Sequence, residues 1–234
     1  ASVFPHKRGI NFLIRRGKKL EDRFVGNAFI FNNKEVTKFL KGKRQTKGFQ
    51  ELTKPYYDKV KDKDDITKMQ YIDFNFWLIG DILLKADKMS MANSLELRVP
   101  FLDKEVMAVA EKIPRRYRVT HKEQTDADTK YITKYAMRLA AKKDTPPQTA
   151  KTAAKKKLGF PVPIRVWLKE DKYYNIVKSS FTGNAANKFF NTDMIVKLLD
   201  DHKNGKADNS RKIWTIYTFL VWYNVYFENS EFVK

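Results

Sequence analysis

Helical periodicity dominates the hydrophobic pattern of this 234-residue chain. The clearest example lies between residues 64 and 94, where apolar side chains recur every three or four positions and cover one broad face of a helix. Gly80 in its middle predicts a break into two helices, with Asp81 capping the second. Further on, Asp103 is placed to cap a helix that Pro114 closes, because a carboxylate can accept hydrogen bonds from free main-chain amides.

Shorter helices and loops are predicted on either side of this region. A short amphipathic helix is expected over Leu20–Phe31, and Asn33 is expected to cap the helix that follows it. Residues 129–143 are rich in alanine, leucine and lysine, which favour helix. Residues 115–128 and 148–157 are charged or basic without an apolar period, and we expect surface loops there.

The C-terminal third has the pattern of a helical scaffold. Thr192 is expected to cap one helix, and Asp208 or Ser210 to cap a second. The second runs from about Arg211 to Phe227 and is apolar on nearly every side, which predicts a buried helix. Its apolar run is shorter than a membrane span and contains Thr, Tyr and Asn, so a membrane role is not expected.

The amino-acid composition excludes several kinds of functional site. The chain has no cysteine, which excludes disulfides, thiolate metal sites and a cysteine nucleophile within it. Its three histidines, His6, His121 and His202, are far apart and lack the spacing of metal ligands. Lys and Arg outnumber Asp and Glu by 47 to 27, a formal charge of +20 that would attract nucleic acid, anionic membranes or phosphorylated molecules. The lysines are spread along the chain, so we favour a solvated surface balanced by acidic parts of a longer protein.

One stretch, Lys85–Asp103 (KADKMSMANSLELRVPFLD), concentrates charged residues among small apolar ones. A purely structural interpretation is a helix that ends near Glu96, with Glu96 and Arg98 as an ion pair. In a functional interpretation, Lys85 and Lys88 share a helical face, because they are three positions apart, and point together at an anion.

The order of residues in this stretch resembles a signature of the glutamine-hydrolysing asparagine synthetases. That signature is K-x-D-[KR]-M-S-M-A followed by S-L-E-x-R-x-P-F-L-D, with Lys88 here where arginine is common. A second match is GFPVPIRVWL, residues 159–168, where the family has G-F-x-x-P-x-x-x-W-L. Just before it the chain departs from the family's R-x-K-x-G-F, because Lys155 replaces the arginine.

The resemblance implies roles for individual residues. Related synthetases place a lysine that contacts the reacting phosphate at the position of Lys157, which makes Lys157 the candidate catalytic residue. A fixed ammonium group there stabilises the extra negative oxygen charge of the transition states. The candidates for substrate or nucleotide binding are Lys85, Asp87 and Lys88. The residues expected to hold the loop behind the nucleotide site are Glu96, Arg98 and Asp103. No metal ligand is expected in this chain.

The implied fold is mainly α, the helical C-terminal portion of an α/β PP-loop ATP-pyrophosphatase domain. Residues 1–234 are accordingly expected to be a partial asparagine synthetase domain. The sequence contains neither the glutaminase domain nor the S-G-G-x-D-S pyrophosphate loop of that family. We therefore expect a fragment, or one chain of a split protein, that is inactive alone.

The implied reaction converts aspartate to asparagine through β-aspartyl-AMP, with ammonia derived from glutamine. ATP and Mg²⁺ are expected to bind mainly to the absent portion, and the full-length protein to form a homodimer. No export signal is visible at the N-terminus, which predicts a cytoplasmic protein. Two alternatives remain open: a related amidotransferase or β-lactam-forming synthetase with another acceptor, and a non-enzymatic basic helical module that binds nucleic acid.

Overall fold

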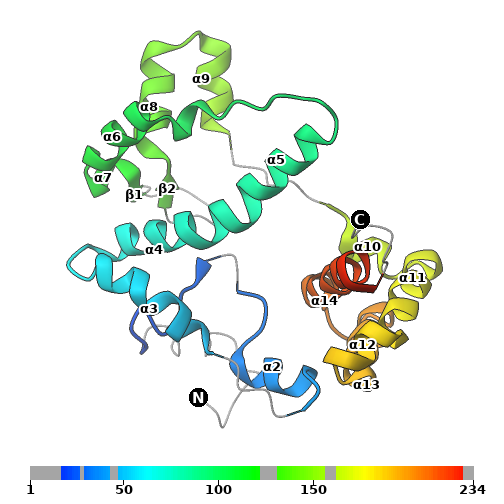
Figure 1. Cartoon of the computed structure of the whole chain (residues 1–234). Coiled ribbons are helices and arrows are strands. Elements are labelled where there is room, and N and C mark those ends of the chain that lie inside the picture. The colour runs from blue at the N-terminus through cyan, green and yellow to red at the C-terminus, as the bar shows by residue number, and fades with distance from the viewer. Residues whose placement is uncertain (1–16, 27–28, 43–46, 122–130, 156–161, 229–234) are drawn as a thin grey trace.

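The computed structural model describes residues 17–26, 29–42, 47–121, 131–155 and 162–228. These residues are mostly helical, which confirms the predicted mainly α fold. Their only sheet is a two-stranded antiparallel one, formed by β1 (Val119–His121) and β2 (Tyr131–Thr133). Figure 1 shows two groups of helices, one built from residues up to 155 and a C-terminal bundle beside it.

The first group surrounds a long central helix (Figure 1). Its helical elements are α2 (Asn33–Phe39), α3 (Phe49–Lys59), α4 (Asp65–Asp73), the π-helical η2 (Phe74–Leu83), α5 (Leu84–Met91), the short 3₁₀ turn η3 (Pro100–Leu102), α6 (Lys104–Lys112), α7 (Arg115–Arg118), α8 (Tyr135–Asp144) and α9 (Pro147–Ala154).

The long helical segment predicted between residues 64 and 94 is confirmed, but its predicted break is wrong. Asp64 caps α4 by accepting from the amides of Ile66 and Thr67, and the chain continues through η2 into α5. Gly80 lies inside η2, because the bulky apolar residues around it favour a continuous helix over the small cost of one glycine. Asp81 is therefore no cap: it accepts from the Trp77 indole at 3.0 Å.

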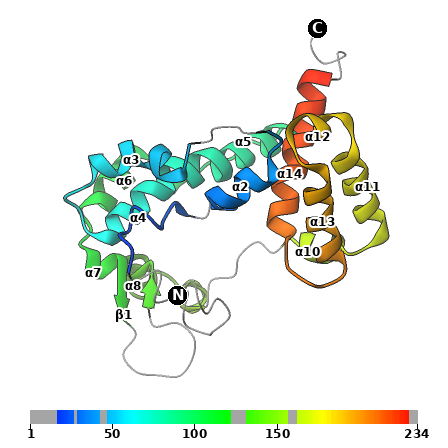
Figure 2. The ribbon, with the colours of Figure 1, turned by 90° about the horizontal axis from the view of Figure 1, so that it is seen from below.

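The C-terminal bundle contains the main core. Its elements are α10 (Ile164–Trp167), α11 (Asp171–Thr182), α12 (Asn184–Phe189), α13 (Thr192–Lys203), α14 (Ser210–Tyr223) and the π-helical η4 (Asn224–Glu228). Figure 2 shows α14 running alongside this group. Fully buried side chains from four helices, among them Phe181, Leu199 and Leu220, meet in one cluster. Helix α2 joins it through Phe39.

Burial of the aromatic helix α14 is only partial, which corrects the sequence-based expectation. Ile213, Ile216 and Leu220 face the core, whereas Trp214 and Trp222 are almost half exposed. No helix among the described residues is long and apolar enough to cross a membrane.

The predicted helix over Leu20–Phe31 is wrong. Leu20 opens a turn and is buried with Tyr57 and Ile72, and Gly26 has the left-handed φ of +70°. A Cβ at Gly26 would lie 1.9 Å from the Asp73 carboxylate, so the chain needs glycine to pass this helix.

Several predicted helix starts are displaced. Asn32, not Asn33, caps α2 in a reciprocal arrangement with Glu35. The helix predicted from residue 129 begins only at Tyr135, because β2 and the left-handed Lys134 precede it. Within 115–128, predicted as loop, α7 and β1 occupy residues 115–121, and residues 122–130 lie outside the described residues.

The basic stretch 148–157, predicted as a loop, is helical up to Ala154 in α9. Pro147 suits the first turn of a helix, and the alanines that follow favour its continuation. The Arg138 guanidinium of α8 donates to the carbonyls of Ala153 and Lys155 at the end of α9, which satisfies groups that a helix terminus leaves free.

In the bundle, Asn191 rather than Thr192 occupies the cap position of α13. At α14 the Asp208 carboxylate accepts from the Ser210 amide at 3.1 Å and from its hydroxyl at 2.7 Å. The cap position of α14 is nevertheless Asn209, so neither residue predicted as the cap occupies it; Asp208 precedes the cap and supplies an acceptor to the first turn.

Candidate functional site

Helix α5 presents the predicted binding residues at the surface. Lys85, Asp87 and Lys88 are all exposed, and the two lysines are one helical turn apart. The Lys85 ammonium lies 3.6 Å from the Asp81 carboxylate one turn earlier. Because both groups are more than half exposed, this ion pair holds Lys85 only weakly, and the ammonium remains available to an anionic ligand.

Ser94 reverses the chain at the end of α5. Its φ of +54° is left-handed, which is uncommon for a residue other than glycine. The Ser94 amide donates to the Met91 carbonyl at 3.0 Å, and the Leu95 amide donates to the Ser90 carbonyl at 2.9 Å. These two bonds form a Schellman motif, which directs the following residues away from the helix axis. Sequence reasoning did not identify Ser94, because serine carries no preference for this conformation.

The three residues expected to support the nucleotide loop organise their own segment. Arg98 and Glu96 form the predicted ion pair at 2.6 Å, but their side chains are 81% and 73% exposed. Asp103 accepts from the Glu105 amide at 2.9 Å, which confirms it as the cap of α6. Within the described part of the chain, none of the three is linked to another element by a hydrogen bond between side chains or by an ion pair beyond these.

The same segment carries an unusual amount of exposed apolar surface. Six large apolar side chains between α5 and η3 are each 45–66% exposed. They are Met89, Met91, Leu95, Leu97, Val99 and Phe101, and we call them the open face. So many half-exposed large apolar side chains within one short segment indicate a site of interaction.

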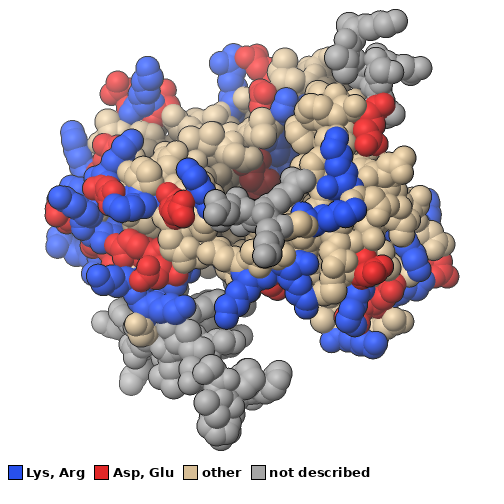
Figure 3. Space-filling view, turned by 60° about the horizontal axis from the view of Figure 1, so that its bottom comes forward, with Lys and Arg blue, Asp and Glu red and all other residues tan. Residues whose placement is uncertain are grey.

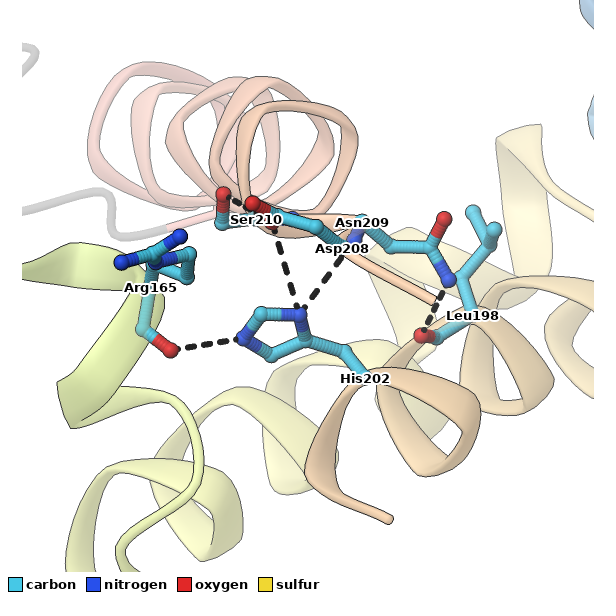
Figure 4. Close-up of polar contacts among 6 residues, drawn as sticks. All are labelled: Arg165, Leu198, His202, Asp208, Asn209 and Ser210. Carbon is cyan, nitrogen blue, oxygen red and sulfur yellow. Dashed lines mark hydrogen bonds and ion pairs between the residues drawn. The ribbon is translucent and has the colours of Figure 1, made fainter. Parts of the chain in front are cut away.

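Lys157 lies outside the described residues, so its predicted role has no structural test here. The segment that follows residues 156–161 is described, and its helix α10 is anchored to the bundle by His202 (Figure 4). The His202 side chain is fully buried. Its Nδ1 accepts from the Asn209 amide at 3.3 Å, and its Nε2 lies 3.0 Å from the Arg165 carbonyl.

These contacts define the tautomer of the ring. Since Nδ1 accepts a hydrogen bond, the proton of the neutral imidazole is on Nε2, which donates to the Arg165 carbonyl. One side chain thus connects α10, α13 and the start of α14. The sequence offered no signal for this role, because both partners are main-chain groups.

Asp208 completes the cluster around His202. Its Oδ1 lies 3.7 Å from His202 Nδ1 (Figure 4). The hydrogen bond from the Ser210 hydroxyl is the main cause that lowers the pKa of the Asp208 carboxyl; burial opposes it, and the Ser210 amide, His202 and Arg165 lower the pKa further. The cluster acts as a structural anchor because the buried ring joins three elements; a surface hollow of about 290 Å³ is lined by Asp208 and Asn209 but not by His202.

Metal binding has no support in the described residues. They contain no group of three or more acidic or histidine side chains that could hold a metal ion. A surface hollow of about 500 Å³ lies between α11, α12 and α14, and it shares no residue with the Lys85–Asp103 stretch. On the face of the molecule that Figure 3 shows, Lys and Arg are scattered with Asp and Glu among them, rather than gathered in one basic patch.

Comparison with known proteins agrees with the family resemblance found in the sequence. A family model described as asparagine synthase matches residues 12–224. The chain is 44% identical over 232 residues to asparagine synthetase [glutamine-hydrolyzing] 1 of Bacillus subtilis, a match that covers 97% of this chain and 34% of the relative. Putative asparagine synthetases [glutamine-hydrolyzing] of Mycobacterium bovis and Mycobacterium tuberculosis are 38% identical over 223 residues, which cover 95% of this chain and 32% of theirs. The chain therefore spans about one third of the length of these curated relatives. No solved structure matches.

Proposed function

The chain belongs to the asparagine synthase family, and on that premise we propose that it is the C-terminal portion of a glutamine-hydrolysing asparagine synthetase. In the assembled enzyme, ATP activates aspartate as β-aspartyl-AMP with release of pyrophosphate. Ammonia from glutamine then displaces AMP to give asparagine. The assembled enzyme is expected to be a cytoplasmic homodimer.

The observation that carries this proposal is the exposure of the whole family signature. Between Lys85 and Asp103, nearly every charged residue is exposed together with the six apolar residues of the open face. Charged groups that serve a ligand and apolar groups that need a partner share one continuous segment. This is the arrangement expected where a second portion of the protein covers the segment and completes a site.

Each candidate residue has a role that its chemistry suits. Lys85 and Lys88 are exposed ammonium groups on one helix and fit the phosphates of ATP or the carboxylate of aspartate. Lys157 is proposed to stabilise the negative charge that develops on the reacting phosphate. Asp87 is proposed to orient a neighbouring ligand group by accepting a hydrogen bond from it.

The described residues fit ATP better than they fit Mg²⁺. Lysines suit phosphate oxygens, whereas a magnesium ion is bound by carboxylates, and no suitable acidic cluster occurs in the described ranges. When bound, Mg²⁺ shields the phosphate charge, and its protein ligands are expected in the remaining portion of the enzyme.

A mixing experiment tests this function. The portion of the Bacillus subtilis relative outside the matched third is produced separately and combined with this chain, and pyrophosphate release is measured with and without aspartate. We expect release only on mixing and only with aspartate. Release that does not depend on aspartate would assign a different acceptor, and a mixture that associates without any release would contradict the proposal.

Variants of single lysines in α5 test whether this chain contributes binding residues to the assembled site. Lys85→Ala and Lys88→Ala each remove a charged contact, for which the expected loss in kcat/KM is about 10- to 100-fold. The matched control is Lys54→Ala, because Lys54 is an exposed lysine in a similar pair with Asp58 one turn along α3. The control is expected to keep the activity of the unmodified mixture.

A further inference from the structure

The segment Leu95–Val99 has the features of a single β-strand. It contains neither helix nor turn, and its residues alternate between aliphatic and charged. The Glu96 and Arg98 side chains are two positions apart and only 2.6 Å from each other. Residues two apart meet in this way when the backbone is extended, because alternate side chains of a strand leave on the same side.

The main-chain groups of this segment differ between its two edges. On one edge, the Leu95 amide donates to Ser90 and the Val99 carbonyl accepts from Leu102, each at 2.9 Å. In an extended chain, the amide and carbonyl of the intervening residues point to the opposite edge. Those of Glu96 and Arg98 make no hydrogen bond within the described structure; on the first edge the groups of Leu97 are also unbonded, but the bonds at Leu95 and Val99 occupy both ends of that edge.

The two faces of the segment are equally distinct. Leu95, Leu97 and Val99 project from one face and are about half exposed, whereas the Glu96–Arg98 ion pair occupies the other. A strand with one free edge and one exposed aliphatic face is a template for pairing with a further strand.

We propose that Leu95–Val99 is an edge strand that pairs with a strand of the nucleotide-binding portion of the synthetase. The pairing uses the main-chain amides and carbonyls of Glu96 and Arg98, and it buries the aliphatic face against that same portion. This inference rests on the proposed function, because that function supplies the partner.

Two observations identify the partner as the remainder of the enzyme. The matched relatives are about three times as long as this chain, so they contain a large portion that the match does not include. The formal charge of +20 favours a partner of opposite charge. Because α5 leads directly into this strand through the bonds at Ser94, pairing also fixes the helix that carries Lys85 and Lys88.

Hydrogen exchange tests the pairing directly. This chain is combined with the portion of the Bacillus subtilis relative outside the matched third, and residue-resolved amide exchange is compared between the free chain and the mixture. We expect exchange at Glu96 and Arg98 to slow at least tenfold in the mixture. The Leu97 amide points to the other edge and should be protected less.

Two matched variants separate the main chain from the side chain. Arg98→Ala and Arg98→Pro both lose the guanidinium group, but only proline also loses the amide hydrogen. We expect Arg98→Pro to weaken association at least tenfold more than Arg98→Ala does. Both changes lie in an exposed segment, and an unchanged far-UV circular dichroism spectrum confirms that the fold is retained.

The outcomes distinguish this inference from the proposed function. Aspartate-dependent pyrophosphate release without protection of Glu96 and Arg98 would overturn the strand and leave the function intact. Protection without pyrophosphate release would support the strand and contradict the function. Protection already present in the isolated chain, rising with its concentration, would make a second copy the partner and overturn the inference.

Discussion

Replacing His202 with leucine tests the anchor between α10 and the bundle. The imidazole is fully buried, and it satisfies the Arg165 carbonyl and the Asn209 amide at once. Leucine is close in size and leaves both main-chain groups without their partner. Each buried group that loses its partner costs about 1–3 kcal/mol.

Part of this cost is offset. Leucine is more apolar than imidazole, and its burial among α10, α13 and α14 returns roughly 1 kcal/mol. The expected net loss in the free energy of unfolding is therefore about 1–5 kcal/mol, a large fraction of the total for a typical domain.

Urea unfolding followed by circular dichroism measures this loss. With a slope of about 2 kcal/mol per molar urea, the midpoint should fall by roughly 0.5–2.5 M. His202→Asn provides a graded control, because the amide oxygen can replace Nδ1 as the acceptor for Asn209 but does not reach Arg165. Its midpoint should lie between those of the leucine variant and the unmodified chain. A leucine variant within about 0.5 kcal/mol of the unmodified chain would refute the reasoning, since that is the range of ordinary surface changes.

Three further predictions concern local structure. Ser94→Gly removes the side chain that strains the left-handed backbone at φ +54°. The urea midpoint should therefore rise by an amount equivalent to about 0.5–1 kcal/mol of unfolding free energy. An unchanged or lower midpoint would show that Ser94 is not strained. The pKa of Asp208 is lowered first by the Ser210 hydroxyl, so its stabilisation is present above the unfolded pKa and is lost as the pH falls through the folded pKa. Asp208→Asn should consequently flatten the fall in the urea midpoint as the pH drops below roughly 4, the pKa of a free aspartate, and an equally steep fall would contradict this. Arg138→Ala removes donors to the end of α9 and should speed amide exchange in that helix about tenfold, without a similar change in α11.

Helices that depend on local sequence were predictable, and those that depend on distant contacts were not. The segment from Asp64 to Ser94 and the cap at Asp103 follow from apolar spacing and from a carboxylate next to free amides. The error over Leu20–Phe31 arose because Gly26 must pass the carboxylate of Asp73, which is far away in the sequence.

Long-range contacts also explain the error over the basic stretch 148–157. Its composition suggested a loop, but Arg138 of α8 binds the carbonyls at the end of α9 and closes that helix. The spacing of residues along the chain gives no indication of such a contact.

The candidate site was likewise predictable from the sequence only in part. The order of residues from Lys85 to Asp103 was enough to identify the family, and the Glu96–Arg98 pair and the Asp103 cap formed as expected. The exposure of the segment was not predictable, because it depends on what covers the segment in three dimensions. The roles of Lys85, Asp87, Lys88 and Lys157 in the reaction stay predictions.

The most direct test of the account is Lys157→Ala in the assembled enzyme, compared with Lys156→Ala as the neighbouring lysine of the same basic run. The measurement is the initial rate of aspartate-dependent pyrophosphate release by this chain mixed with the remaining portion of the Bacillus subtilis relative. The account predicts a loss of about 100-fold or more for Lys157→Ala, as expected when a charged group that stabilises the transition state is removed, and little change for Lys156→Ala. Equal rates for the two variants, or release that does not require aspartate, would contradict it.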